Sequence, residues 1–196
     1  GLPVSEPLAR GGTAARQRAN EILNRLEGVD KPVVIEVGVN TGILSQLLLS
    51  LRPDLTLYMV DSWRGEQEQP DEYKQTNDMF ALRTQAAADA AKARVCAMAG
   101  KFGNRAKVVV LDSVAAAETF EDKSVDLVFI DADHSYEGCK ADIEAYTRVT
   151  RKWISGHDYR NPYPPYDFSG VDRAVEEAFG EVETGKNVTW FKCLYA

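Results

Sequence analysis

Acidic side chains lie in or at the end of four short apolar runs of this sequence. Glu36 lies within "VVIEVG", and Asp61, Asp112 and Asp131 end "LYMVD", "VVVLD" and "VFID". Apolar runs of this kind predict buried strands of a parallel sheet, and ligands of such sheets bind beyond the carboxyl ends of the strands. Acids at that edge accept hydrogen bonds from ribose hydroxyls. The pattern therefore indicates a nucleoside with a positively charged or hydroxyl-rich neighbour.

A glycine-containing turn follows the first of these runs. In "EVGVNTG", Gly38 and Gly42 are four positions apart, and Asn40 stands between them. Glycines let the backbone turn sharply and approach a ligand, and the amides of a following helix favour carboxylate or phosphate groups. A tight turn before a helix also occurs in α/β proteins of other kinds. Asp61, about 25 residues further on, supports the interpretation of this turn as a ligand-binding turn, because an acid at that position can bind a ribose.

The only two histidines each follow a predicted strand. His134 comes three residues after Asp131, and His157 and Asp158 end "KWISGHD". We expect these two strands to be neighbours, roughly 5 Å apart, so that both histidines lie at one rim. Either histidine can then act as a general base. The competing interpretation is that they are ordinary loop residues.

The elements that must position these residues alternate along the chain. This alternation predicts βαβ units with a mostly parallel sheet between layers of helices, an α/β fold. Residues 181–195 predict a hairpin that adds an antiparallel strand to the edge of the sheet. Strands are predicted over residues 32–38, 55–61, 106–112, 125–131 and 152–158, and helices over residues 13–28, 41–51, 137–149 and 170–180.

Two segments at the ligand edge exceed simple connections. Residues 62–106 are longer than a crossover requires, and their polar first part is either a lid or an irregular entry to one long solvated helix. The tract "HDYRNPYPPYDFSG" carries four aromatic residues among three prolines. It is either the wall of an acceptor pocket or a loop whose aromatic side chains shield the core. We expect residues 1–12 to form a flexible tail and residues 13–196 to form a single domain.

The composition of the chain limits the classes of binding partner that we expect. The chain has 196 residues, a net charge of −7 and a pI near 5.0, which argue against nucleic acid and anionic membranes. It shows neither an apolar run of the roughly 18 residues that a spanning helix needs nor a signal-peptide core. We expect a cytoplasmic protein with a small-molecule partner, and a homo-oligomer is compatible with the sequence. Cys96, Cys139 and Cys193 are odd in number and scattered, so we expect them to be reduced and structural.

Taken together, the motifs resemble class I S-adenosylmethionine-dependent methyltransferases. The segments that carry the resemblance are "EVGVNTG", "YMVDSW", "VVVLDS", "VDLVFIDADHSYEGCKADIEAY" and "ISGHDY", in this order over residues 33–195. "DxxHSYEG" followed by "GHDY" is similar to the small-molecule O-methyltransferase branch. The resemblance implies a Rossmann-like, doubly wound sheet of seven strands, with the last strand antiparallel and helices on both faces. It also implies S-adenosylmethionine as the cofactor and a methyltransferase domain over residues 13–196.

The same resemblance implies roles for individual residues. The methionine part of the cofactor would lie against Glu36, Gly38 and Gly42, and the ribose against Asp61. The adenine edge would face Asp112 and Ser113, with Trp63 packed on the base, while Asp131 would lie beside the sulfonium. Asn40 replaces the middle glycine of the familiar GxGxG turn, and it tolerates left-handed backbone angles. The implied cofactor-binding residues are Glu36, Gly38, Asn40, Gly42, Asp61, Ser62, Trp63, Asp112, Ser113 and Asp131.

Two mechanisms and three functions remain open at this point. Some relatives with a similar "DAD" strand end bind a divalent cation, and the matching positions here are Asp131 and Asp158, which suit Mg²⁺. The competing hypothesis, which the sequence slightly favours, is metal-free catalysis with His134 or His157 as the base. The acceptor hydroxyl can belong to a sugar, a polyketide-like compound or a phenol. A noncatalytic module on the same fold and a nicotinamide-dependent dehydrogenase are the alternative functions.

Overall fold

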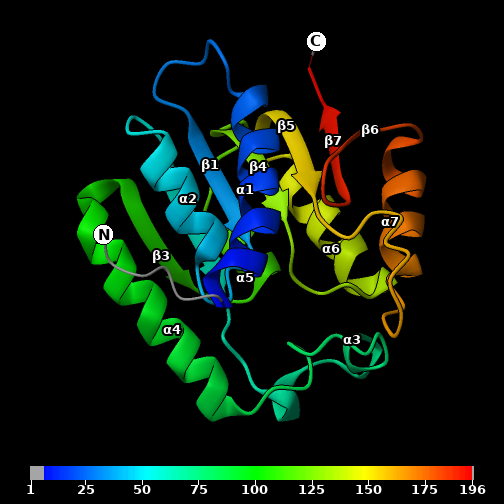
Figure 1. Ribbon diagram of the computed structural model, residues 1–196. Helices are drawn as coiled ribbons and strands as arrows, with labels where there is room; N and C mark the ends of the chain where they lie inside the picture. Colours follow the sequence, from blue (N-terminus) through cyan, green and yellow to red (C-terminus); the bar gives the residue numbers. More distant parts are fainter. Residues whose placement is uncertain (1–6, 196) are drawn as a thin grey trace.

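The chain forms one seven-stranded sheet in the computed structural model, which describes residues 7–195 (Figure 1). The strand order is β3-β2-β1-β4-β5-β7-β6, and the first five strands pair in parallel. The predicted mostly parallel, doubly wound sheet is therefore confirmed. The strands are β1 (Val33–Val37), β2 (Thr56–Asp61), β3 (Ala106–Val110), β4 (Val125–Ile130), β5 (Thr150–Gly156), β6 (Glu183–Gly185) and β7 (Thr189–Cys193).

The predicted C-terminal hairpin forms one edge of the sheet. β7 is antiparallel to its neighbours, as expected, and lies between β5 and β6, so β6 is the edge strand. Trp190 and Phe191 of β7 are fully buried on opposite faces, so this strand needs cover on both sides. β6 has three residues and is largely exposed, which suits an edge.

Helices cover both faces of the sheet (Figure 1). Successive strand residues point to opposite faces, so Val34 belongs to one hydrophobic core and Ile35 to the other. The first core lies under α1 (Pro7–Arg25), α2 (Ile43–Leu51) and α4 (Gln85–Ala99), and the second lies under α5 (Ser113–Ala117), α6 (Tyr136–Thr147) and α7 (Ser169–Phe179).

The first helix begins earlier than predicted. α1 starts at Pro7, six residues before the expected start at Thr13, so the second half of the predicted flexible tail is helical. Proline is well suited to a first helical position. Residues 1–6 of the predicted tail lie outside the described residues. Ala15, Ala19 and Ile22 of this helix are fully buried against the sheet.

The long segment between β2 and β3 has an irregular first part followed by one long helix. Its first part contains a 3₁₀ turn (Glu66–Glu68) and the short α3 (Asp71–Lys74), which lies beyond the carboxyl ends of the strands in Figure 1. Its second part is the long helix α4. The Thr84 hydroxyl caps α4 by accepting a hydrogen bond from the Ala87 amide at 3.1 Å.

Two further expectations concern membranes and cysteines. Between residues 7 and 195, no helix is both long and apolar enough to cross a membrane. All three cysteines are free. Cys139 is buried in the core, in line with a structural role, but Cys96 is exposed on α4 and does not have one.

The ends of β1 and β4 come very close together at Gly38. This glycine has φ of +89°, and a Cβ atom there would lie 1.9 Å from the carbonyl oxygen of Asp131. The Asp131 amide also donates to the Val37 carbonyl oxygen at 2.7 Å. Only glycine satisfies both the backbone angle and this spacing.

We expect Gly38→Ala to lower the free energy of unfolding by at least about 2 kcal/mol, because it adds a left-handed alanine and a backbone clash. Urea denaturation measures this loss. Gly100→Ala is the matched control, since a Cβ atom at Gly100 meets nothing within 4 Å, and we expect a change below about 1 kcal/mol. Equal effects of the two substitutions would contradict the proposed constraint at Gly38.

Candidate functional site

A cavity of about 570 Å³ lies beyond the carboxyl ends of the strands. This volume is in the range of small-molecule sites. Its walls come from the strand ends, from residues 62–83 and from the aromatic tract after β5. The predicted site residues that line it are Glu36, Gly38, Asn40, Asp61, Ser62, Asp112, Ser113, Asp131, His134, His157 and Asp158.

Gly42 and Trp63 do not line the cavity, which corrects two predicted cofactor contacts. A Cβ atom at Gly42 would lie 3.1 Å from the side chains of Val95 and Met98, so this glycine faces α4. The Trp63 indole is 1% exposed, lies in the core and donates from Nε1 to the Asn40 carbonyl oxygen at 2.9 Å. Trp63 thus stabilises the glycine turn from the core side, and its ring is not available to stack on an adenine.

Asp61 holds the glycine turn in place. Its Oδ2 accepts from the amides of Val39 and Asn40, both at 2.9 Å, and its Oδ1 accepts from the Trp63 amide at 2.8 Å. A carboxylate has about four acceptor positions, so one stays available for a ligand hydroxyl. Asp61 is therefore a structural residue of the turn as well as a residue of the cavity wall.

Glu36 brings a neutral carboxyl group to the floor of the cavity. It is 3% exposed and accepts a hydrogen bond from the Ser45 hydroxyl of α2. Burial raises the pKa of Glu36 to about 8, and the charges of Asp131 and Asp61 add to this effect. At neutral pH the side chain is mostly protonated, so it can donate as well as accept a hydrogen bond.

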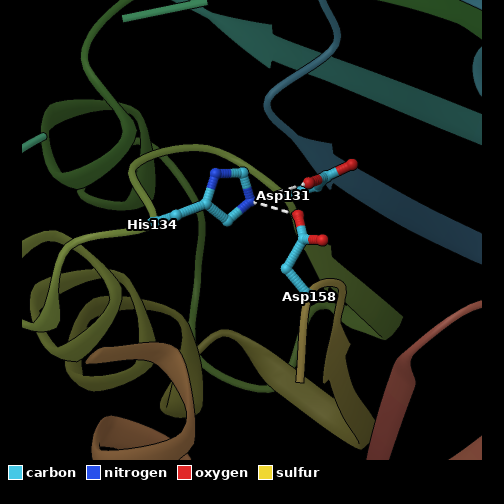
Figure 2. A group of neighbouring side chains, drawn as sticks. All are labelled: Asp131, His134 and Asp158. Carbon is cyan, nitrogen blue, oxygen red and sulfur yellow. Dashed lines mark hydrogen bonds and ion pairs between the residues drawn. The ribbon is translucent and has the colours of Figure 1, made fainter. Parts of the chain in front are cut away.

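One side of the His134 ring faces Asp131 and Asp158 (Figure 2), and Asp78 lies on the other side. Its Nδ1 is 2.7 Å from Asp78 Oδ2, and its Nε2 is 3.0 Å from Asp131 Oδ1 and 2.9 Å from Asp158 Oδ2. Burial opposes a charged ring, but the three carboxylates outweigh burial and raise the pKa of His134 well above its usual value. The ring also packs 4.6 Å from the ring of Phe168. His134 is therefore an imidazolium with both protons engaged.

His157 has a similar environment. Its Nδ1 is 3.0 Å from Asp158 Oδ2 and 3.5 Å from Asp131 Oδ1, and its Nε2 is 3.0 Å from Asn187 Oδ1. Burial lowers the pKa of His157, but Asp131 and Asp158 reverse this and raise it to about 9. Each ring nitrogen of both histidines therefore faces an acceptor oxygen, which favours the doubly protonated rings over a general base.

The histidines in turn lower the pKa values of Asp131 and Asp158. Burial alone would raise the pKa values of Asp131 and Asp158, but the two histidine cations hold both well below the usual range. Asn161 also donates to Asp158 Oδ1 at 2.7 Å. Both carboxylates are therefore ionised over the physiological pH range, and each depends on nearby positive charge.

The predicted metal pair, Asp131 and Asp158, is brought together with His134. One potential ligand atom from each of the three residues lies within 4.8 Å of the others. Two carboxylate oxygens and an imidazole nitrogen are donors that a divalent cation accepts, provided that the imidazole loses its proton. The donor chemistry thus fits a divalent cation.

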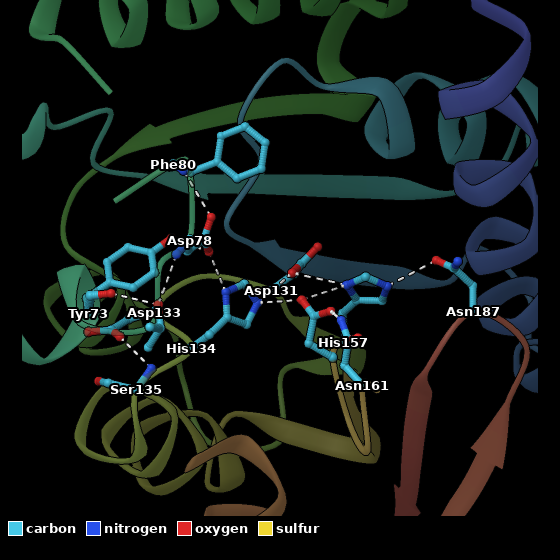
Figure 3. Close-up of polar contacts among 12 residues, drawn as sticks. Tyr73, Asp78, Phe80, Asp131, Asp133, His134, Ser135, His157, Asn161 and Asn187 are labelled. Atoms are coloured by element: carbon cyan, nitrogen blue, oxygen red, sulfur yellow. Dashed lines mark hydrogen bonds and ion pairs between the residues drawn. The ribbon is translucent and has the colours of Figure 1, made fainter. Parts of the chain in front are cut away.

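A chain of polar contacts joins this cluster to distant elements (Figure 3). On one side, the Tyr73 hydroxyl donates to Asp78 Oδ2 at 3.0 Å, which connects α3 to His134. On the other side, Arg18 of α1 donates to Asn187 Oδ1 at 2.7 Å, the same oxygen that faces His157. Asp78 and Asn187 were missed by the sequence interpretation, because no motif marks an acid or amide inside a polar segment.

The opposite end of the cavity contains a second group of acids. Asp112 forms an ion pair with Arg64, and its Oδ2 lies 3.3 Å from Arg64 Nη1. The Ser113 hydroxyl donates to Asp142 of α6, which the sequence interpretation did not single out. Burial raises the pKa of Asp142 to about 7.

The two segments that we expected near the ligand edge both contribute to the cavity wall. They add both aromatic or apolar and polar side chains, and Arg83 adds a cation that hydrogen bonds to Asn40 Oδ1 at 2.7 Å. The contributing residues are Ser62, Arg64, Gln69, Pro70, Tyr73, Asp78, Met79, Phe80 and Arg83 of the first segment and His157, Asp158, Asn161, Tyr166 and Phe168 of the second.

Solved structures of methyltransferases are similar to this chain. The O-methyltransferase NovP aligns with a TM-score of 0.60 at 12% identity, over 93% of this chain and 78% of NovP. An S-adenosylmethionine-dependent methyltransferase from Aquifex aeolicus aligns with a TM-score of 0.53 at 19% identity, over 95% and 93% of the two chains. Spermidine synthase from Thermotoga maritima aligns at 0.52 and 14% identity, over 90% and 58%. These alignments show the fold alone.

A comparison with family models shows which family the chain belongs to. No curated protein matches the chain. The family model described as a methyltransferase domain matches residues 35–159, which span β1 to the start of the aromatic tract. The match covers more than half of the chain and includes the strand ends around the cavity. The chain therefore belongs to this methyltransferase family and is an S-adenosylmethionine-dependent enzyme.

Proposed function

We propose that this enzyme transfers the methyl group of S-adenosylmethionine to a hydroxyl group of a small molecule. The observation that carries the proposal is the composition of the single cavity described above. Polar groups from the ends of β1, β2, β3 and β4 line one part, and aromatic and apolar side chains of two connecting segments line another. Donor and acceptor would then meet beside Asp131, His134 and Asp158. The similarity to NovP, an O-methyltransferase, supports a hydroxyl acceptor.

The cofactor would lie along the strand ends. Gly38 lines the cavity at the turn after β1, and the remaining acceptor position of Asp61 suits a ribose hydroxyl. The neutral Glu36 suits the methionine part, because it adds no second negative charge near the cofactor's own carboxylate. The ionised Asp131 suits the positive sulfonium.

The methyl acceptor would lie between residues 69–83 and the aromatic tract after β5. Met79 and Tyr166 are 61% and 38% exposed, and both line the cavity together with Phe80 and Phe168. Flat aromatic and flexible methionine side chains pack on rings or short apolar chains that carry a hydroxyl. Methyl transfer is an in-line displacement, so these walls would mainly hold the oxygen in line with the methyl group.

The proton of the acceptor hydroxyl needs a path out of the site. Since His134 and His157 are both protonated, the structure gives less support to the metal-free base than the sequence did. Asp131, His134 and Asp158 would hold a divalent cation such as Mg²⁺ once His134 gives up its Nε2 proton. When bound, such a cation lowers the pKa of a hydroxyl. His157 would keep both carboxylates oriented.

We expect Asp61→Ala to weaken binding of S-adenosylhomocysteine about ten- to hundredfold, because a charge-assisted hydrogen bond and the support of the turn are both lost. Isothermal titration calorimetry measures the affinity. Asp71→Ala is the control, since Asp71 is an exposed aspartate of α3 that pairs with Lys74 outside the cavity. Unchanged affinity in a folded Asp61→Ala protein would remove Asp61 from the site.

Removal of divalent cations with EDTA tests whether a bound metal ion assists loss of the acceptor's proton. With radiolabelled S-adenosylmethionine and a panel of sugar, phenolic and polyketide-like hydroxyl compounds, we expect turnover that EDTA abolishes and Mg²⁺ or Mn²⁺ restores. Asp158→Ala should lower the metal affinity at least tenfold, because it removes one of three ligands. Full activity in EDTA that disappears in His134→Ala or His157→Ala would instead establish the metal-free mechanism.

A further inference from the structure

Three arginines of the described chain line the cavity, and their charges are balanced differently. The Arg64 guanidinium forms an ion pair with a carboxylate of the wall. Arg18 and Arg83 form no ion pair within residues 7–195. Each of these two donates from Nη1 to the side-chain oxygen of an asparagine at 2.7 Å, and that oxygen is neutral. Two cations of the wall therefore have no anion beside them in the described part of the chain.

The Arg83 guanidinium has donors to spare. It is partly buried, and its Nη2 has no hydrogen-bond partner among the described residues and is not one of the fully buried atoms. Its backbone is fixed, because its carbonyl oxygen accepts from the Glu66 amide at 2.8 Å and the next residue, Thr84, caps α4. A partly buried cation without a counterion is unfavourable. An anionic ligand in the cavity would supply the missing charge and acceptor atoms.

Arg83 lies beside apolar surface that can hold the rest of such a ligand. Met79 and Phe80 belong to the same segment, line the same cavity and are 61% and 40% exposed. On its other side, Arg83 contacts Asn40 in the turn after β1. This combination matches a molecule with an apolar or aromatic body and one acidic group.

The cofactor accounts for only one of the two unpaired arginines. S-adenosylmethionine carries a single carboxylate, and the proposed function brings its methionine part to Glu36. Arg18 is the arginine whose charge acts on that residue: burial raises the pKa of Glu36 to about 8, and Arg18 opposes the shift. Arg83 is then left for an anion from a second molecule, which in the proposed function is the methyl acceptor.

We infer that Arg83 binds a carboxylate group of the methyl acceptor, so that the enzyme methylates hydroxylated apolar or aromatic acids. The inference rests on the proposed function, which places the acceptor between residues 69–83 and the aromatic tract. A guanidinium binds a carboxylate through two parallel hydrogen bonds, a geometry that lysine does not reproduce. A phosphate monoester suits the site less well, because it brings about two negative charges into a cavity that already contains many acids.

The test compares benzoate with benzamide, which has nearly the same shape but no charge, on protein saturated with S-adenosylhomocysteine. NMR titrations of the two ligands measure their affinities. We expect the wild-type protein to bind benzoate at least about tenfold more tightly than benzamide, and Arg83→Gln to bind the two within about twofold of each other. Arg83→Lys should retain only part of the preference. Arg94→Gln is the control and should keep all of it, since Arg94 is an exposed arginine of α4 outside the cavity.

A second measurement tests whether Arg83 instead binds the carboxylate of the cofactor. S-adenosylhomocysteine carries that group and methylthioadenosine lacks it, so Arg83→Gln should change the two affinities by factors that agree within about twofold. A selective loss of S-adenosylhomocysteine binding would assign Arg83 to the cofactor and overturn the inference.

Three further results would overturn the inference: equal binding of benzoate and benzamide by the wild-type protein, no binding of benzoate, or a preference for benzoate that survives in Arg83→Gln. The first two need no variant to fold. If the wild-type protein did not bind S-adenosylhomocysteine, the proposed function itself would fail. The failure of the inference and the failure of the proposed function are therefore distinguishable.

Discussion

Charge balance around the half-buried Asp131 and the buried Asp158 is the constraint on which the site depends. Asp131 and Asp158 end adjacent strands, and neither is stable there as an anion without positive charge nearby. His134 and His157 supply that charge through hydrogen bonds to both acids. Because each histidine uses its second nitrogen for a partner on another element, the balance extends from α1 to the segment after β2.

This arrangement links the segment after α3 to the histidine–aspartate cluster. Asp78 is buried, accepts from Tyr73 and holds the Nδ1 proton of His134, so the position of the segment after α3 and the charge state of His134 are coupled. A divalent cation at Asp131 and Asp158 would replace the Nε2 proton and leave the Asp78 contact unchanged.

The two ends of the cavity use buried acids in different ways. At one end, Asp131 and Asp158 are ionised because cations surround them. At the other end, burial raises the pKa of Asp142 to about 7, and only its Oδ1 has a hydrogen-bond partner, the Ser113 hydroxyl. The same residue type is thus held ionised by cations in one place and shifted toward the neutral form by burial in the other. The difference comes from the neighbours, not from the strand ends themselves.

The sequence by itself determined the alternation of strands and helices, the sheet with its antiparallel last strand, and the edge where acids and histidines gather. These follow from local periodicity and from the rule that parallel strands end at one edge. Only the tertiary structure decided that Trp63 lies in the core, that β7 lies inside the sheet, that both histidines are protonated and that Asp142 has a free oxygen. Each of these depends on side chains that are distant in sequence, such as Asp78, Asn187 and Ser113, whose meeting no local pattern encodes.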